Sequence, residues 1–119
     1  MPKLSKLFVV IDPTTDHQTA LLNAEWIASQ SSDISVHIYA AIHSLNDIND
    51  IVYTLDRATI AALERVETKR HRQWIESMST SIRGGGNDVE IEVEWTGNWR
   101  DAIVPAAERC GADLIIKTA

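Results

Sequence analysis

Four short apolar segments alternate with three segments of helical pattern along the chain. Residues 7–11 are apolar throughout and stop at an aspartate and a proline, which is typical of a strand buried on both faces. Residues 114–116 are also apolar without a break, whereas residues 34–42 begin with alternating apolar and polar side chains. In residues 89–94 valine or isoleucine alternates strictly with glutamate, so this segment is predicted to be an edge strand with one wet face.

The helical segments are recognised by apolar residues three and four positions apart. The first is predicted to follow Asp16 as its N-terminal cap, with apolar positions at Ala20, Leu21, Ala24, Ile27 and Ala28. The second is predicted as one long helix from about residue 55 to residue 82, ended by a turn at residues 84–86, which are all glycine.

The third helix is expected over residues 102–110, and Gly111 is expected to close it. Either Asn98 or Asp101 can cap its N-terminus. With Asp101 as the cap, Pro105 falls in the first turn, where its missing N–H costs little.

The resulting order, βαβαβαβ, predicts an open, doubly wound parallel α/β sheet with helices on both faces. Placing the wet-faced strand at an edge and the first strand inside gives the spatial order 3-2-1-4. The chain then reverses direction between the first and fourth strands, and sheets of this kind bind ligands at such a point, outside the carboxyl ends of the strands. The loop at residues 12–15 and the tail after Ile116 therefore flank the predicted ligand site.

Composition and charge narrow the choice of partner and compartment. The 119 residues are expected to form one domain, residues 1–119, and the net charge of −6 argues against nucleic acid as a partner. The single cysteine, Cys110, cannot form an internal disulfide, and the apolar run at residues 7–11 is too short for a signal peptide or a membrane span. We therefore expect a cytoplasmic protein that does not engage a membrane.

The chain carries no pattern typical of an enzyme or of a metal site. His37 and His43 have no cysteine or carboxylate beside them at ligand spacing, and residues 47–50 lack the glycine and distal glutamate of a calcium loop. The basic run at residues 69–72 is interpreted as a solvated helix face, and Cys110 has no patterned base to activate it. We expect neither enzymatic activity nor a bound metal.

Two segments of the sequence resemble a known family in order and spacing. They are residues 9–14, Val-Val-Ile-Asp-Pro-Thr, and residues 112–118, Ala-Asp-Leu-Ile-Ile-Lys-Thr. They look like the opening and fourth-strand signatures of universal stress proteins, and the lysine and threonine at 117–118 are more similar to the tandem-domain E-type members. The chain resembles the first four strands of the first domain of such a protein.

This resemblance implies an adenine nucleotide alpha hydrolase-like fold that lacks its last strand and helix, so that the domain is expected to be incomplete at the C-terminus. In ATP-binding members of the family, the acid after the first strand and a residue at the end of the second contact the adenosine. The matching positions here are Asp12, with Pro13 and Thr14 beside it, and Ala40 or Ala41. An aspartate before a proline is equally an ordinary turn former, so both interpretations of Asp12 stay open.

The phosphates of the nucleotide are held in the family by a glycine-rich loop just after the fourth strand, and this sequence stops at Ala119. We therefore expect no cofactor for these 119 residues, with ATP or AMP binding expected only if the chain continues. The predicted function is a stress-response module without enzymatic activity that acts through self-association or protein partners; the alternative is an adenine-nucleotide binding regulatory domain. A homo-oligomer is expected, because the fourth strand leaves an apolar edge on which only Lys117 is charged, and a charge discourages pairing with another chain.

Overall fold

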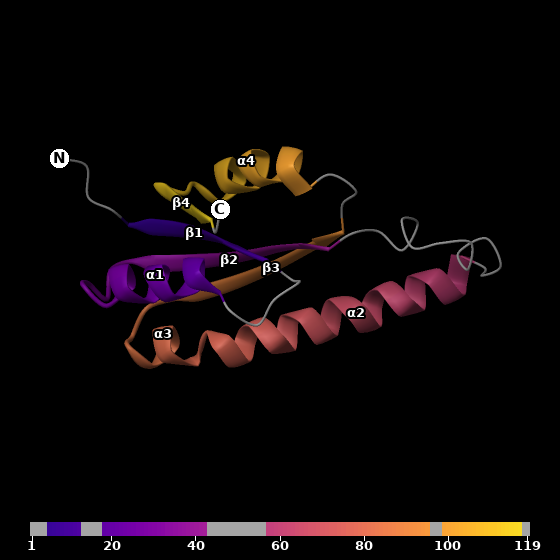
Figure 1. Cartoon of the computed structure of the whole chain (residues 1–119), viewed down its shortest axis with the longest axis horizontal. Helices are drawn as coiled ribbons and strands as arrows, with labels where there is room; N and C mark the ends of the chain where they lie inside the picture. The colour runs from indigo at the N-terminus through magenta and orange to yellow at the C-terminus, as the bar shows by residue number, and fades with distance from the viewer. Residues whose placement is uncertain (1–4, 13–17, 43–56, 96–98, 118–119) are drawn as a thin grey trace.

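The chain forms a four-stranded parallel sheet with helices on both faces (Figure 1), seen in a computed structural model that describes residues 5–12, 18–42, 57–95 and 99–117. The strands are β1 (Lys6–Ile11), β2 (Ser35–Ile42), β3 (Val89–Trp95) and β4 (Leu114–Lys117). Their spatial order is β3-β2-β1-β4, as the sequence predicts. The continuously apolar β1 lies inside the sheet, and the glutamate-rich β3 lies at one edge.

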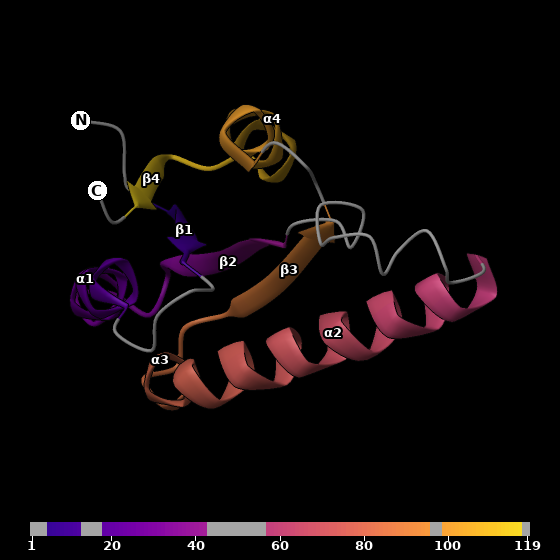
Figure 2. The same cartoon turned by 45° about the vertical axis from the view of Figure 1, so that its right-hand side comes forward.

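The helices divide between the two faces of the sheet. Figure 2 shows α1 (Thr19–Ala28), α2 (Arg57–Met78) and α3 (Thr80–Gly84) on one side and α4 (Trp99–Cys110) on the other. This is the doubly wound arrangement expected from the βαβαβαβ order. No helix in the described ranges has the length and apolar character needed to cross a membrane.

Two apolar cores result, one on each face of the sheet. The larger lies under α1, α2 and α3 and contains Leu7, Val9, Ile11, Ala20, Leu21, Ala24, Ala28, Ile34, Val36, Ile38, Ala40, Ile75, Ile82 and Ile91. The smaller lies under α4 and contains Phe8, Val10, Tyr39, Ile103, Ala106 and Ala107. Alternate residues of β1 therefore enter opposite cores, which explains why every residue from Leu7 to Ile11 is apolar.

The start of α1 differs from the prediction. The helix begins at Thr19 with Gln18 in the N-cap position, so Asp16, which itself lies outside the described residues, is not its cap. Gln18 caps no backbone N–H with its side chain, because that side chain is bonded to Asp12 instead.

The long helix predicted from residue 55 to residue 82 is also not continuous. Ser79 separates α2 from α3, with φ −90° and ψ 0°. Its backbone N–H is shared between the carbonyls of Ile75 and Glu76, and its hydroxyl donates to Glu76 O at 2.9 Å. These bonds accompany the break between α2 and α3 at this buried residue. The predicted glycine turn is confirmed, since α3 ends at Gly84 and Gly86 has φ +90°.

Helix α4 starts earlier than predicted, at Trp99, which places Asp101 in its first turn and excludes it as the cap. Pro105 consequently lies inside the helix and not in the first turn. The C-terminus is as expected: Gly111 has φ +72°, its N–H donates to Glu108 O at 3.1 Å, and the N–H of Ala112 donates to Ala107 O at 3.1 Å. These two bonds form a Schellman motif, which turns the chain sharply into β4.

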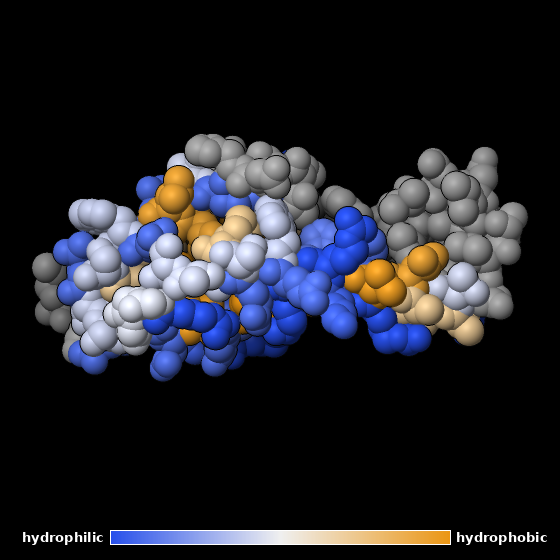
Figure 3. Space-filling model, turned by 90° about the horizontal axis from the view of Figure 1, so that it is seen from below, coloured by the Kyte–Doolittle hydropathy of each residue, from blue (hydrophilic) through white to orange (hydrophobic). Residues whose placement is uncertain are grey.

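The N-terminal part of α2 extends past the end of the sheet (Figures 1 and 2). Its apolar side chains Leu63 and Val66 are 41% and 55% exposed, and Figure 3 shows apolar surface on this projecting part, apart from the body of the molecule. The C-terminal half of the same helix packs on the sheet through Trp74, Ile75 and Met78. The helical spacing in the sequence is therefore used for packing only over the second half of α2.

Candidate functional site

The carboxyl ends of β1, β2 and β4 meet at one edge of the sheet, where the ligand site is predicted. Ile11 pairs with Ala40 and Val10 pairs with Lys117, so Asp12 follows β1 directly at the level where β2 continues into Ala41. The structure thus brings Asp12, Ala40 and Ala41 together at this edge. The other two predicted site residues, Pro13 and Thr14, lie outside the described residues.

Gln18 fixes the backbone of Asp12 at this edge. Its side-chain oxygen accepts a hydrogen bond from Asp12 N at 3.1 Å, and its side-chain nitrogen donates to Asp12 O at 2.6 Å. Gln18 is only 5% exposed, whereas the Asp12 side chain stands in solvent. The two bonds hold the backbone at the end of β1 from the start of α1, and they come from a residue that the sequence analysis did not identify. The only signal for it in the sequence is an uncommon cap residue, glutamine, at the start of α1.

The two alanines of the predicted site differ in what they can contact. Ala40 is 0% exposed and belongs to the core under α1, so its methyl group is unavailable to a ligand. Ala41 is partly buried and packs against the smaller core on the α4 face. Of the two, Ala41 is therefore the residue that can offer a side-chain contact at this edge.

A second polar cluster lies on the α4 face of β2 and β3. The buried imidazole of His37 stands between two carboxylates, with Nδ1 at 3.2 Å from Glu90 Oε2 and Nε2 at 2.8 Å from Glu92 Oε1. Its ring stacks on Phe8, with ring centroids 5.5 Å apart. His37 thus lies on the α4 side of β2, and both of its ring nitrogens contact carboxylates of β3.

Tyr39 and Arg109 extend this cluster toward α4. The Tyr39 hydroxyl donates to Glu94 Oε2 at 2.5 Å, and burial together with this carboxylate holds the pKa of Tyr39 well above its usual range. Arg109 of α4 donates to Glu92 Oε2 at 3.2 Å. The glutamates of β3 therefore bond the edge strand to β2 and α4. They are less exposed to solvent than the alternating pattern predicts.

The other residues that the sequence analysis considered as metal ligands or nucleophiles can be placed in part. No group of three or more histidine, cysteine, aspartate or glutamate side chains in the described ranges could hold a metal ion, and His43 and residues 47–50 lie outside those ranges. Cys110 is partly buried with its thiol directed at Ala107 O, 3.3 Å away. In this part of the chain, no base is placed beside the Cys110 thiol to activate it as a nucleophile.

The free side of β4 is the most apolar exposed feature of the sheet. Among the strands that the structure describes, β4 pairs only with β1, and its Leu114 and Ile115 are 40% and 41% exposed. Leu114 pairs with Leu7, whose side chain lies in the core under α1, so Leu114 points to the α1 face. On α1, Leu22 and Trp26 are 56% and 69% exposed. We call Leu114, Ile115 and the unpaired side of the strand the β4 edge.

Comparison with known proteins relates the chain to universal stress proteins. No family model matches the chain, but a curated relative, universal stress protein E of Photorhabdus laumondii, is 25% identical over 117 residues. Among solved structures, universal stress protein UspA from Lactobacillus plantarum superposes with a TM-score of 0.74 at 13% identity, covering 98% of this chain and 78% of that one. The chain is thus similar in sequence to a universal stress protein and shares the fold of universal stress proteins.

Two further structures of the family have the same fold. A universal stress protein family member from Burkholderia pseudomallei superposes with a TM-score of 0.68 at 16% identity, covering 97% of this chain and 81% of that one. A universal stress protein solved in complex with cAMP superposes with a TM-score of 0.59 at 19% identity, covering 94% and 70%. The match to universal stress protein E spans 98% of this chain and 36% of the relative, so the chain corresponds to about a third of that protein.

Proposed function

We propose that this chain is a cytoplasmic stress-response module without enzymatic activity, and that it acts by associating with a second copy of itself through the β4 edge. The observation that carries the proposal is the exposure of Leu114 and Ile115 on a strand that is paired on one side only. The similarity to universal stress protein E and the fold shared with universal stress proteins support the stress-response role.

The unpaired backbone groups of an edge strand are the physical reason to expect association. An edge strand presents a row of N–H and C=O groups that can pair with another chain, and natural proteins usually protect such edges with charges, prolines or covering elements. The described part of β4 carries one charged side chain, Lys117, at its end. A two-fold operation would pair β4 with its own copy and bury the same apolar side chains on both.

The β3 edge is protected in the way that β4 is not. Glu90, Glu92 and Glu94 line β3, and Arg72 of α2 donates to the carbonyl oxygen of Ile91 at 3.0 Å. Charged side chains and a covering helix both discourage pairing with another strand. The two ends of the sheet therefore differ in their capacity for association, and β4 is the favoured one.

The test is the effect of Ile115→Lys on the mass of the protein in solution, measured by light scattering. A lysine in the centre of the edge places a charge where the second copy would pack, so we expect a shift toward monomer. Val66→Lys is the matched control, because Val66 is 55% exposed but lies on α2. It should leave the mass unchanged.

An oligomer that survives Ile115→Lys, or one that Val66→Lys dissociates equally, would remove β4 from the interface. Far-ultraviolet circular dichroism of both variants shows whether each retains its fold, so that a monomer produced by unfolding is not mistaken for one produced by a lost interface.

A second candidate function is adenine-nucleotide binding at the carboxyl edge of the sheet. It is supported by Asp12, held in place by Gln18, and by a relative solved in complex with cAMP. Asp12 and Ala41 would contact the adenosine, whereas phosphates are held by backbone N–H groups, as at a helix N-terminus.

We therefore expect the 119-residue chain to bind ATP more weakly than about micromolar in isothermal titration, since phosphate contacts supply much of such affinity. Where binding is measurable, Asp12→Asn should weaken it. A micromolar affinity would contradict the expectation, and an affinity unchanged by Asp12→Asn would exclude Asp12 from the site.

A further inference from the structure

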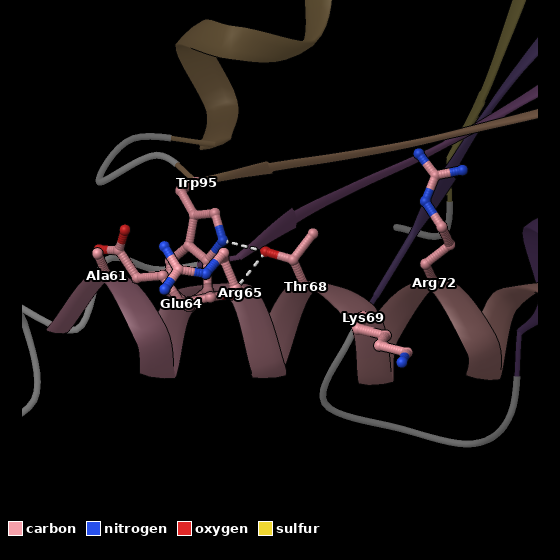
Figure 4. Close-up of a pocket in the computed structure, with 7 residues that line it drawn as sticks. All are labelled: Ala61, Glu64, Arg65, Thr68, Lys69, Arg72 and Trp95. Carbon is pink, nitrogen blue, oxygen red and sulfur yellow. Dashed lines mark hydrogen bonds between the residues drawn. The ribbon is translucent and has the colours of Figure 1, made fainter. Parts of the chain in front are cut away.

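A groove lies between the middle of α2 and the carboxyl end of β3 (Figure 4), and none of its lining residues belongs to the site at Asp12, Ala40 and Ala41. Its volume is about 480 Å³, within the range of small-molecule sites. We call it the α2–β3 groove, and it is lined by Ala61, Glu64, Arg65, Thr68, Lys69, Arg72 and Trp95. Six of these residues lie on α2 at helical spacing, so one face of the helix forms the floor and the indole of Trp95 forms a wall.

A chain of hydrogen bonds fixes that wall. Trp95 Nε1 donates to Thr68 Oγ1 at 2.5 Å, and Thr68 Oγ1 donates in turn to Glu64 O at 2.8 Å. The indole is thereby held at the end of β3 against α2, and its polar N–H is satisfied. What the ring offers to the groove is its apolar surface, already ordered before any ligand arrives.

The charge of the groove is opposite to that of the whole chain. Arg65, Lys69 and Arg72 contribute three positive charges and Glu64 one negative charge, a balance of +2, whereas the chain has a net charge of −6. Cations gathered around a cleft raise the local concentration of anions. The basic run interpreted in the sequence as a solvated helix face thus contributes two of its residues, Lys69 and Arg72, to a cleft.

The arginines differ in how they are placed. Arg65 lies beside the indole, and within the described residues its guanidinium makes no hydrogen bond or ion pair. Arg72 stands further along α2 and is oriented toward the sheet by its bond to Ile91 O. Lys69 points away from Trp95 (Figure 4), so it contributes charge more than contact. Arg65 is therefore the residue best placed to bind an anionic group next to the ring.

We propose that the α2–β3 groove binds a small organic anion that carries a flat apolar ring, with the ring against Trp95 and the phosphate or carboxylate on Arg65. An arginine presents paired N–H donors that match both kinds of anion, and an ordered aromatic wall favours a planar group over an aliphatic one. The site shares no residue with the carboxyl edge at Asp12, Ala40 and Ala41. The inference is independent of the proposed association through β4.

The test is isothermal titration calorimetry of the full chain with phenyl phosphate. Inorganic phosphate and phenol, the two halves of this probe, are titrated separately. Phenyl phosphate should bind about tenfold more tightly than either half, because only it engages the ring and the charge together. Arg65→Gln should weaken phenyl phosphate binding about tenfold, the loss expected for one charge-assisted hydrogen-bonding group.

Arg70→Gln is the matched control, because Arg70 lies on the same helix and its guanidinium pairs with Glu67 at 2.9 Å, outside the groove. It removes the same charge and should leave the affinity unchanged. Absence of phenyl phosphate binding at millimolar concentration would overturn the proposal, and so would equal losses in Arg65→Gln and Arg70→Gln. Chemical shift changes centred on Asp12 and not on the Trp95 indole would also overturn it, since they would place the probe at the carboxyl edge.

Discussion

Asp113 joins the two ends of the described chain through a single carboxylate. Its Oδ2 accepts three hydrogen bonds, from Ser5 N at 2.9 Å, from Ser5 Oγ at 2.8 Å and from Lys6 N at 2.9 Å. The bonds from Ser5 are the main cause of a pKa of Asp113 below its usual range. The negative charge of this exposed residue therefore fixes the entry to β1 beside the entry to β4.

Replacing Asp113 by asparagine should reduce stability in a pH-dependent way. A carboxyl whose pKa is lower in the folded state contributes stability above its unfolded pKa of about 3.9, and that contribution is lost as the pH falls through the folded value. We expect Asp113→Asn to be less stable than the parent chain at neutral pH, and the difference to shrink in acid. Urea unfolding of both chains at several pH values measures it. A difference that stays constant across this range would show that the charge of Asp113 is not involved.

The two faces of β3 give a second prediction at the scale of residues. Ile91 is 9% exposed and lies in the larger core, so Ile91→Ala should lower the free energy of unfolding by about 2 to 5 kcal/mol. Glu92, although bonded to His37 and Arg109, is partly exposed, and Glu92→Ala should cost less than about 1 kcal/mol. Denaturant melts of the two variants provide the comparison. Equal losses would mean that the two faces of β3 are not distinguished as the structure describes.

At this scale the sequence predicts which β3 side chains face the core, because alternation has a period of two. It does not predict that His37 and Tyr39 are buried, since their partners come from Phe8, β3 and α4, far away in the chain. Asp12 could be predicted as part of the candidate site from its place after an apolar strand. Gln18 could not, because its bonds to Asp12 depend on the turn between them.

Among the helices, propensity and spacing predict existence well and boundaries less well. The break between α2 and α3 leaves no mark in the apolar spacing, because it falls at Ser79, and helices also accommodate serine. Pro105 in α4 suggested a helix beginning just before it, yet the helix begins at Trp99. Packing of Ile103, Ala106 and Ala107 on the smaller core accompanies the longer helix and offsets the missing hydrogen bond.

The end of α4 gives a prediction at the scale of elements. Gly111 has φ +72°, so Gly111→Ala forces a side chain into the left-handed region and should cost about 1 kcal/mol. Gly84 ends α3 without a positive φ, and a Cβ built on it meets no atom within 4 Å. Gly84→Ala should therefore be neutral or stabilise the chain by up to about 1 kcal/mol. Thermal unfolding of both variants measures the contrast, and a loss at Gly84 as large as that at Gly111 would contradict it.

The order of the sheet could be predicted at the scale of the whole molecule, because one wet-faced strand and one fully apolar strand leave few arrangements of a βαβαβαβ chain. The projection of α2 beyond the sheet could not, since its exposed Leu63 and Val66 have the same helical spacing as residues that pack. Nor could the α2–β3 groove, which needs the end of β3 placed against the middle of α2. Both features depend on lengths of elements and not on patterns within them.

The molecule as a whole is asymmetric in its edges, with a charged and covered β3 at one end of the sheet and an apolar β4 at the other. In a parallel sheet closed on neither side, the unprotected edge is the one at which strands are added. The exposure of Leu114 and Ile115 thus supports the proposal that association takes place at this end of the molecule.

Sedimentation velocity of the unmodified chain, over concentrations from about one to about one hundred micromolar, tests this account most directly, because self-association through a defined interface follows mass action. The account predicts a dimer or larger species whose fraction rises with concentration. A chain that sediments as a monomer throughout this range would contradict it.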